Sequence, residues 1–451
     1  MSAVVEPNRP ASPRLPLLLD AAGARPIAWR GRHAIDVASF LGDVAAIAAQ
    51  LPERNHAINL CSDRYAFLAS FCAIASRGQT NLLPAARTPQ TIAETLVAYP
   101  GSYRLGEPGS DADCVLPSLG KQRNAALPLL DAGQTIAIGF TSGSTGQPKA
   151  NPKRWGPLHI GEAHNIAALV AALQLAPGKV ANIVATVPPQ HMYGLELSIL
   201  LPLLGPFAVH AGHPLFPADV AAALAEVPAP RVLVTTPVHL RALLAGGQHL
   251  PAVGAIVCAT APLDRELAAQ AEARLGAPLL ELFGSTETCV IAQRRTARET
   301  DWRLFDGASL RPQPDGTLVE APWIDPPVAL QDLIELRPDQ RFQLCGRHAD
   351  LIEIAGKRAS LADLTRRVLA LPGVEDAALL QLDRPDSMGV QRIAALVVAP
   401  TRTQADLIDA LRAVIDPAFL PRPLQKVDVL PRNGTGKLPR AALLAWLEER
   451  S

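Results

Sequence analysis

Residues 141–149 read TSGSTGQPK and form the segment of the chain best suited to bind phosphate. The two glycines allow the main chain to approach a ligand closely, and the hydroxyl, N–H and ammonium groups can face phosphate oxygens. The segment is not a Walker A loop, because Gly146 is followed by Gln-Pro-Lys and not by Lys-Ser or Lys-Thr. A flexible surface turn has a similar composition. The candidate phosphate contacts are Thr141, Ser142, Gly143, Ser144, Thr145, Gly146 and Lys149.

Five further segments carry charged, aromatic or polar residues, four of them beside glycine or proline. They are PPQHMYG (188–194), ELFGSTE (281–287), LQDL (330–333), CGR (345–347) and NGTGKLPR (433–440). Taken alone, each has an ordinary structural reading. A single histidine is usually structural, a strand can end in a turn with an exposed glutamate, and Asn-Gly-x-Gly-Lys is a common turn composition. Their order along the chain is therefore the informative feature.

In that order, these segments resemble the signatures of the adenylate-forming superfamily. This superfamily contains acyl-CoA synthetases, aryl-CoA ligases, firefly-type luciferases and the adenylation domains of peptide synthetases. The resemblance covers residues 135–440, and only the Asp-Leu part of the family's Thr-Gly-Asp-Leu signature survives in LQDL. It implies a large N-terminal domain followed by a small mobile C-terminal lid.

The resemblance also implies how the nucleotide is held. Phe283 flanks the adenine, Thr286 contacts the α-phosphate and Glu287 holds Mg²⁺, for which a carboxylate oxygen is a suitable ligand. Asp332 accepts hydrogen bonds from both ribose hydroxyls, as a carboxylate with several acceptor sites can. Arg347 is the second nucleotide contact.

For the acid and the thiol, the resemblance assigns three further regions. His191 lies near the reacting carboxylate, Lys437 reaches into the active site, and Gly356 lines a tunnel for a pantetheine thiol. The expected acyl pocket is mostly apolar and offers no charged partner for an amino group, which favours an aromatic or medium-chain acid over an amino acid. The pocket residues are His191, Met192, Leu282, Gly284, Cys289 and Val290.

The implied activity is that of an ATP-dependent, AMP-forming acid–thiol ligase. Such an enzyme uses Mg²⁺, activates a carboxylic acid as an acyl adenylate, and passes the acyl group to coenzyme A or to the pantetheine of an acyl carrier protein. Two alternatives stay open. One is a non-catalytic nucleotide-binding relative, and the other is a luciferase-like oxygenase that uses an adenylate.

The sequence departs from the family pattern at the hinge between the two domains. The segment that usually reads Gly-Arg-x-Asp is GRHAD (346–350), with Ala349 at the usual position of the aspartate. Asp350 either replaces that residue or the hinge works differently. Glu353 stands where the family usually has a lysine, and its simplest reading is an exposed strand residue.

Apolar runs alternate with Ala- and Leu-rich helical stretches, which predicts a layered α/β architecture with buried parallel strands. Asp264 and Gly276 bound a predicted helix as its N-cap and its stop. The N-terminal AMP-binding domain is expected to span residues 1–347, and an α+β lid residues 348–451. The predicted strands are 135–140, 182–187, 231–235, 255–259 and 279–283, then 351–354, 377–382, 393–398 and 426–430; predicted lid helices are 361–371 and 404–415.

The composition excludes several other classes of protein. Lys+Arg and Asp+Glu both number 42 among 451 residues, so net charge gives no reason to expect a nucleic-acid partner. The six cysteines are scattered without a CxxC pair, which favours a reducing, cytoplasmic setting without a zinc site or disulfide framework. The apolar run 195–209 is interrupted by Glu196 and two prolines, so no membrane insertion is expected.

Overall fold

The structure is a computed structural model that describes residues 12–142, 148–347, 351–354, 357–382, 391–432 and 438–448. The chain divides into two compact units. The first contains residues up to Thr300 with 305–308 and 321–325, and the second contains 301–304, 309–320 and 326–451. The domain boundary expected after residue 347 stays a prediction.

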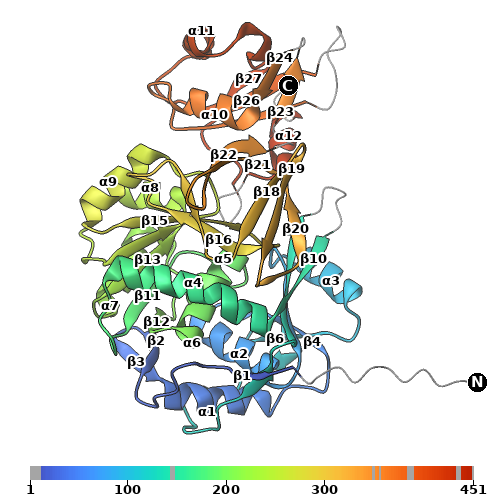
Figure 1. The fold of residues 1–451 in the computed structure, drawn as a ribbon, viewed down its shortest axis with the longest axis vertical. Helices are drawn as coiled ribbons and strands as arrows, with labels where there is room; N and C mark the ends of the chain where they lie inside the picture. The colour runs from blue at the N-terminus through green and yellow to red at the C-terminus, as the bar shows by residue number, and fades with distance from the viewer. Residues whose placement is uncertain are drawn as a thin grey trace, which may run out of the picture. The chain divides into compact units, whose positions relative to one another are not determined.

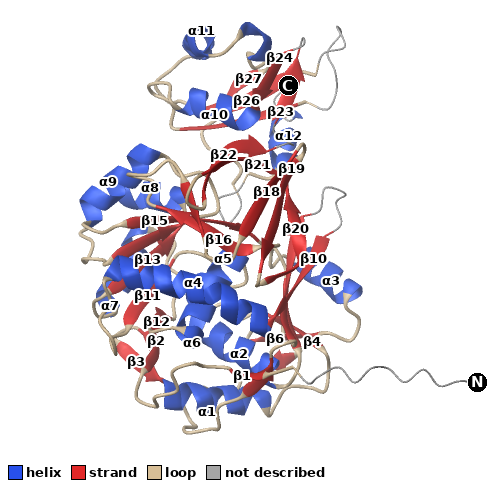
Figure 2. Ribbon diagram, viewed as in Figure 1, coloured by secondary structure: helices blue, strands red, loops and turns tan. Residues whose placement is uncertain are grey.

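A largely parallel sheet forms the body of the first unit (Figures 1 and 2). Within this unit its strands follow the order β16–β15–β14–β13–β11–β12–β2–β3. The strands from β15 to β2 run parallel, and β16 and β3 are antiparallel to their neighbours. The bounds are β2 Pro26–Arg30, β3 His33–Asp36, β11 Ala181–Ala185, β12 Phe207–His210, β13 Arg231–Thr235, β14 Ala255–Cys258, β15 Leu279–Ser285 and β16 Cys289–Arg294.

Helices α7 (Pro217–Glu226), α8 (Pro237–Ala245) and α9 (Arg265–Leu275) pack their apolar residues against β11, β13, β14 and β15. The predicted bounds of α9 are confirmed. The Asp264 carboxylate accepts hydrogen bonds from the N–H groups of residues 266 and 267, and Gly276 ends the helix at a φ of +65°. The predicted layered α/β class is confirmed as well, because the strands lie buried as continuous apolar runs.

A second sheet of the first unit has the order β10–β9–β5–β4–β6–β7. Helix α2 (Arg64–Ser76) contacts β4 and β5 of this sheet and β12 of the larger one, and it is apolar and buried almost all round. It therefore fixes the spacing of the two sheets. The strands are β4 His56–Asn59, β5 Thr80–Leu83, β6 Tyr103–Gly106, β7 Cys114–Val115, β9 Thr135–Ser142 and β10 Pro148–Arg154, and β1 (Arg14–Pro16) pairs separately with β8 (Leu129–Asp131).

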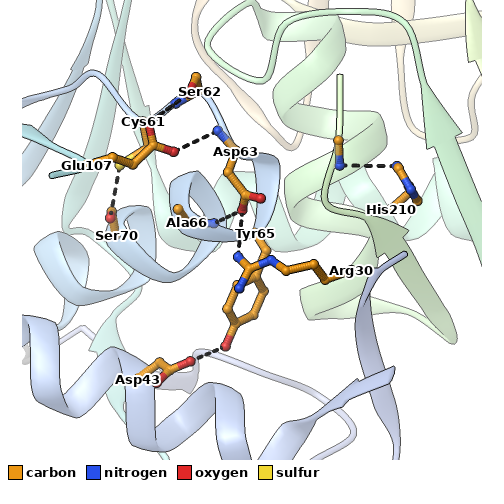
Figure 3. A network of polar contacts seen from close by, with 11 residues as sticks. Arg30, Asp43, Cys61, Ser62, Asp63, Tyr65, Ala66, Ser70, Glu107 and His210 are labelled. Carbon is orange, nitrogen blue, oxygen red and sulfur yellow. Dashed lines mark hydrogen bonds and ion pairs between the residues drawn. The ribbon is translucent and has the colours of Figure 1, made fainter. Parts of the chain in front are cut away.

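The start of α2 is held by a network of polar contacts (Figure 3). The Asp63 carboxylate caps the helix by accepting from Ala66 N at 2.8 Å, and it also accepts from Arg30 at 3.1 Å. The Glu107 carboxylate accepts from the N–H groups of Ser62 and Asp63 at 3.1 and 2.8 Å. Side chains thus satisfy the main-chain N–H groups that a helix start leaves without partners.

The remaining helices of the first unit include α1 (Val37–Ala48), α3 (Pro89–Ala98) and α4 (Trp155–Leu173). The apolar run 195–209 divides into the end of α5 (Met192–Leu195), a π-helical turn η1 (Glu196–Leu200), α6 (Leu201–Leu204) and β12. Among the described residues, no helix has the length and apolar character needed to cross a membrane.

The second unit begins with antiparallel strands. Strands β18 (Ser309–Gln313), β19 (Gly316–Ala321) and β20 (Ile324–Leu330) form one sheet, and β21 (Asp332–Arg337) pairs with β22 (Arg341–Arg347), which also pairs with β17 (Trp302–Leu304). Next come the hairpin β23 (Leu351–Ile354) and β24 (Lys357–Ser360) and the sheet β25 (Asp376–Gln381), β26 (Ile393–Val398) and β27 (Leu424–Lys426).

Apolar side chains cover both faces of the sheet β25–β26–β27. Helices α10 (Leu361–Leu369) and α11 (Gln404–Val414) belong to the apolar cluster on one face, and α12 (Arg440–Glu448) to that on the other. The predicted strand 426–430 is wrong, because the ladder with β26 pairs residues 424–426 only. Val427 N donates a last hydrogen bond to the Val397 carbonyl at 3.0 Å, and Val427 and Leu430 are buried against the α12 side beyond the ladder, so burial produced their apolar pattern.

We predict that the buried guanidinium of Arg64 is a main support of this fold. It donates to Ser198 Oγ at 2.6 Å and to the carbonyls of Ala185 and Val187 at 2.9 and 2.8 Å. Arg64→Met should lower the free energy of unfolding in urea by about 2–4 kcal/mol, because each buried polar group without a partner costs about 1–3 kcal/mol. Arg30→Met, which removes an exposed ion pair with Asp63, should cost less than about 1 kcal/mol. Equal losses in the two variants would contradict this role.

Candidate active site

The predicted phosphate loop joins β9 to β10. These strands form an antiparallel hairpin in which Ser142 pairs with Pro148 and Thr141 with Lys149. The main chain of Ser142 thus stands at one end of the loop, and the exposed Lys149 stands opposite Thr141. Residues 143–147, which include the candidates Gly143, Ser144, Thr145 and Gly146, lie outside the described part of the chain.

A tight turn after β15 carries the predicted α-phosphate and metal contacts. The Ser285 hydroxyl accepts from the N–H groups of Glu287 and Thr288, each at 3.2 Å. The Thr288 hydroxyl in return accepts from Ser285 N at 3.0 Å. These bonds fix the turn and leave the side chains of Thr286 and Glu287 half-buried, hence within reach of a ligand.

This turn lies against the β9–β10 hairpin. Thr141 Oγ1 donates to Glu287 Oε1 at 3.3 Å. A Cβ at Gly139 would lie 2.9 Å from Thr286 Cγ2. The Thr286 side chain can therefore pack against β9 because residue 139 is a glycine. Two motifs 146 residues apart in sequence thus share one surface.

A carboxylate and a hydroxyl side by side are hard oxygen donors, and Mg²⁺ usually takes one or two protein carboxylates and completes its shell from phosphates and water. The residues at this turn therefore fit that ion. Among the described residues, no group of three or more His, Cys, Asp or Glu side chains could hold a metal by itself.

The segment with His191 forms a second turn beside this region. His191 precedes α5, and its carbonyl accepts from Leu195 N at 2.7 Å. Gly194 is required here, because a Cβ would lie 2.0 Å from the Pro188 carbonyl oxygen. Helix α5 contacts β16, so His191 and Met192 come from an element next to Cys289.

The structure describes all the predicted pocket residues. Met192, Leu282, Cys289 and Val290 are buried, His191 is half-buried and Gly284 is exposed. Phe283, the predicted adenine contact, is half-buried on β15. Their assignment to an acyl group or a nucleotide stays a prediction.

Sequence reasoning missed a cluster of buried ionisable and polar groups behind the turn. Lys153 Nζ donates to the Glu287 carbonyl at 2.9 Å, and Glu196 Oε1 accepts from Val290 N at 2.9 Å. Asn165 Nδ2 donates to Glu162 Oε2 at 3.1 Å and approaches Glu196 Oε1 at 3.5 Å. A carboxyl group thus bonds directly to the main chain of Val290, and the expectation that the acyl pocket offers no charged partner for an amino group stays a prediction.

Burial controls the ionisation of this cluster. It raises the pKa of Glu162 well above its usual value, with the neighbouring Glu196 as a second cause. Burial also raises the pKa of Glu196, against the opposing effects of Val290 N and the Lys153 charge. The pKa of the Cys289 thiol rises to about 12, again by burial, although Lys153 opposes the shift. The Cys289 thiol is therefore protonated near neutral pH and not a thiolate nucleophile.

One signal in the sequence pointed to this cluster. Glu196 is a lone acidic residue in an apolar run, and acidic residues are rarely fully buried unless they have partners. Lys153 gave no comparable signal.

The two predicted ribose and nucleotide contacts meet in the second unit. Asp332 on β21 and Arg347 on β22 are direct partners in the antiparallel ladder. The pairing brings their Cα atoms together across the ladder. Ala349, Asp350, Gly356 and Lys437 lie outside the described residues.

Comparisons with known proteins agree with the motifs. A family model described as AMP-binding enzyme matches residues 46–315. The chain is 30% identical to a 4-coumarate–CoA ligase of Halorhodospira halophila, over 69% of this chain and 77% of that protein. It is 31% identical to a 4-coumarate–CoA ligase of Rhodobacter capsulatus, over 61% and 67%.

Solved structures share the fold. ATP-bound MatB from Rhodopseudomonas palustris superposes with a TM-score of 0.78 at 18% identity, covering 95% of this chain and 97% of that one. O-succinylbenzoate coenzyme A synthetase from Bacillus subtilis, in complex with ATP and magnesium ion, gives a TM-score of 0.79 at 16% identity and covers 95% and 99%. The family model spans more than half of the chain. In the chain, Thr141 of the phosphate-loop motif contacts Glu287 of the Thr-Glu motif. The chain belongs to the AMP-binding enzyme family, and its resemblance to the adenylate-forming enzymes is confirmed.

Proposed function

We propose that the protein is an ATP-dependent, AMP-forming ligase that joins a carboxylic acid to a thiol. The observation that supports this most directly is the contact of Thr141 with Glu287, which unites the phosphate-loop hairpin with the turn that carries the acidic residue. The relatives named as CoA ligases support the same reaction class.

In the first half-reaction, a carboxylate oxygen of the acid attacks the α-phosphorus of ATP. An acyl adenylate forms and pyrophosphate leaves. Both reactants are anions, so the site must neutralise charge and fix their geometry. Lys149 at the mouth of the loop and the hydroxyls of Thr141 and Thr286 are the groups of the described chain that we assign to the phosphates.

Glu287, with the Thr141 hydroxyl beside it, would hold Mg²⁺. When bound, the ion supplies Lewis-acid stabilisation of the phosphate oxygens. His191 orients the reacting carboxylate from the turn before α5. Phe283, Asp332 and Arg347 are proposed to hold the adenine and ribose.

In the second half-reaction, the thiol sulfur attacks the carbonyl carbon of the acyl adenylate, a thioester forms and AMP leaves. We assign Lys437 to the first half-reaction only and the segment around Gly356 to the approach of the thiol. Coenzyme A and a carrier-protein pantetheine both remain candidate acceptors. Relatives named as CoA ligases favour the first, and a relative named L-proline–[L-prolyl-carrier protein] ligase from Pseudomonas fluorescens, 34% identical over 27% of this chain, favours the second.

For the acid, we propose an aromatic or medium-chain substrate. The buried Met192, Leu282, Cys289 and Val290 form the apolar side of the region. Pyrophosphate release across a panel of acids, followed by product analysis with coenzyme A and with a carrier protein, tests both choices. A chain that binds ATP but releases no pyrophosphate with any acid would be a non-catalytic relative. Oxygen consumption would indicate the luciferase-like alternative.

A cytoplasmic setting belongs to the proposal, since the six cysteines are free thiols.

The carboxylate of Glu287 provides the first test. Glu287→Gln keeps the size of the side chain and removes its charge, so pyrophosphate release should fall on the order of 10²–10³-fold, as for loss of one charge-stabilising group. The thermal midpoint should change little, because the side chain is half-buried at a turn. Glu94→Gln, at an exposed position of α3, serves as the matched control. Near-normal pyrophosphate release in Glu287→Gln would remove this residue from the site.

Lys437 provides a test of the two half-reactions. Lys437→Ala should abolish formation of the adenylate from acid and ATP, because it removes a positive charge needed only there. Given chemically prepared acyl adenylate and the thiol, the same variant should form thioester at close to the normal rate in single-turnover assays. Lys426→Ala, an exposed lysine of the same unit, should affect neither step. Equal loss in both steps would show that Lys437 supports structure or a shared site.

Alkylation provides a test of a mechanism without a cysteine nucleophile. At pH 8, iodoacetamide should modify the exposed Cys345 and leave Cys289 intact, since the thiolate is the reactive form and burial raises the pKa of Cys289 to about 12. Peptide mass spectrometry reads both sites, and unfolding in guanidinium should expose all six cysteines to the reagent. Rapid modification of Cys289 in the folded protein would mean that its thiol is activated.

A further inference from the structure

The turn that carries Glu287 is held from behind at two points. Lys153 Nζ donates to the Glu287 carbonyl, and Glu196 Oε1 accepts from Val290 N, each at 2.9 Å. Lys153 and Glu196 are only 8% and 4% exposed. Both bonds go to the main chain, so they constrain the course of residues 287–290 and not one side chain.

Each of the two holding residues follows a different motif. Lys153 lies on β10, four residues after Lys149, and Glu196 follows the PPQHMYG segment on η1. The turn itself follows β15. Three segments that carry predicted site residues are thereby joined through buried polar groups.

A second layer fixes Glu196. Asn165 Nδ2 donates to Glu162 and approaches Glu196, and the Asn165 and Glu162 side chains are each 2% exposed. Both come from α4, which follows β10 directly. The carboxyl group that holds Val290 N is thus held in turn by the helix that continues the phosphate-loop hairpin.

We propose that Lys153 and Glu196 are positioning residues. Lys153 sets the direction in which the Glu287 carboxylate presents its oxygens to the bound cation, and Glu196 sets the position of the Val290 main chain at the acyl pocket. This assignment rests on the proposed function, because it takes Glu287 as the metal carboxylate. It assigns Lys153 to metal binding and Glu196 to acid binding. Neither residue belongs to the motifs.

If Lys153 and Glu196 only stabilised the fold, their removal would have a different effect. Buried charged groups contribute to stability in either direction, depending on how well their partners compensate the loss of hydration. Removal of such groups would then change the free energy of unfolding without a specific change in metal or acid binding. Groups behind a metal ligand instead change metal affinity or activity by about 10–100-fold when they are removed.

The first experiment measures the metal directly. Lys153→Met keeps the length of the side chain and removes the donor to the Glu287 carbonyl. Binding of Mn²⁺ in the presence of ATP, followed by electron paramagnetic resonance without any acid, should weaken at least about tenfold. Asp43→Asn is the matched control, because Asp43 is a buried carboxylate that accepts from Tyr65 (Figure 3) and contacts none of the described residues of the turn. Its other oxygen accepts from Gly120 N. This variant should lower the thermal midpoint and leave Mn²⁺ affinity unchanged.

The second experiment separates the hydrogen bond from the charge at Glu196. Glu196→Gln retains an oxygen that can accept from Val290 N, and Glu196→Leu does not. The KM for the acid should rise about tenfold or more in Glu196→Leu and return towards the normal value in Glu196→Gln, with Mn²⁺ affinity little changed in both. This pair also decides the proposal if Lys153→Met does not fold.

Two results would overturn the inference. One is unchanged Mn²⁺ affinity in folded Lys153→Met, and the other is an equal effect of Gln and Leu at position 196 on the KM for the acid. Failure of the proposed function has a different signature. The unaltered protein would then release no pyrophosphate with any acid of the panel, or Glu287→Gln would bind Mn²⁺ with ATP as tightly as the unaltered protein.

Discussion

The contact between the β15–β16 turn and the β9–β10 hairpin is the constraint on which the candidate site depends. Thr141 lies at the carboxyl end of β9 and Glu287 follows that of β15, and each strand runs parallel to a neighbour in a different sheet. Ligands of α/β proteins bind outside such strand ends, because loops there can converge without disturbing the core. The two sheets must lie at a fixed spacing for these ends to meet, and the buried helix α2 provides that spacing by packing on both. Helix α2 thus sets the spacing of the sheets, and the hydrogen bonds of Thr141 and Lys153 to Glu287 join the hairpin to the turn.

Buried polar groups support this arrangement at a cost in hydration. The guanidinium of Arg64 is fully buried, and its hydrogen bonds go to a hydroxyl and to two carbonyls. Burial lowers the pKa of Arg64, because the charged guanidinium has lost its hydration. Lys153 and Glu196 follow the same pattern, since each bonds to main-chain groups near the end of a strand. A buried charge that bonds to main chain fixes the path of a loop more strictly than an apolar side chain of equal size, because its hydrogen bond has a preferred direction.

The sequence predicted the elements whose signals are local. Strand β13 was predicted with its observed bounds, and α9 was predicted from the cap at Asp264 and the glycine at 276. The strand expected at 426–430 was wrong because an apolar pattern reports burial, and Val427 and Leu430 are buried beyond the end of the ladder at residue 426. The order of the motifs indicated the family, yet no local pattern could give the approach of Thr141 to Glu287. The same limit applied to Lys153, whose partner at position 287 is 134 residues away. Glu196 was visible as an acidic residue in an apolar run, but its partner Val290 was not.

Strand β10 shows how burial gives one residue type two roles. Successive side chains of a strand point to opposite faces, so Lys149, Asn151 and Lys153 share one face. Lys149 is exposed at the mouth of the predicted phosphate loop, Asn151 approaches Thr141 Oγ1 at 3.4 Å, and Lys153 is buried against the Glu287 carbonyl. An exposed ammonium on a flexible stem can follow a ligand that arrives from solvent, whereas a buried ammonium must keep a fixed partner because it has lost its water. The gradient of burial along one strand therefore separates the lysine suited to contact phosphate from the lysine that holds the turn. Residue type alone could not have made that distinction, since it arises from the depth at which the hairpin enters the first unit.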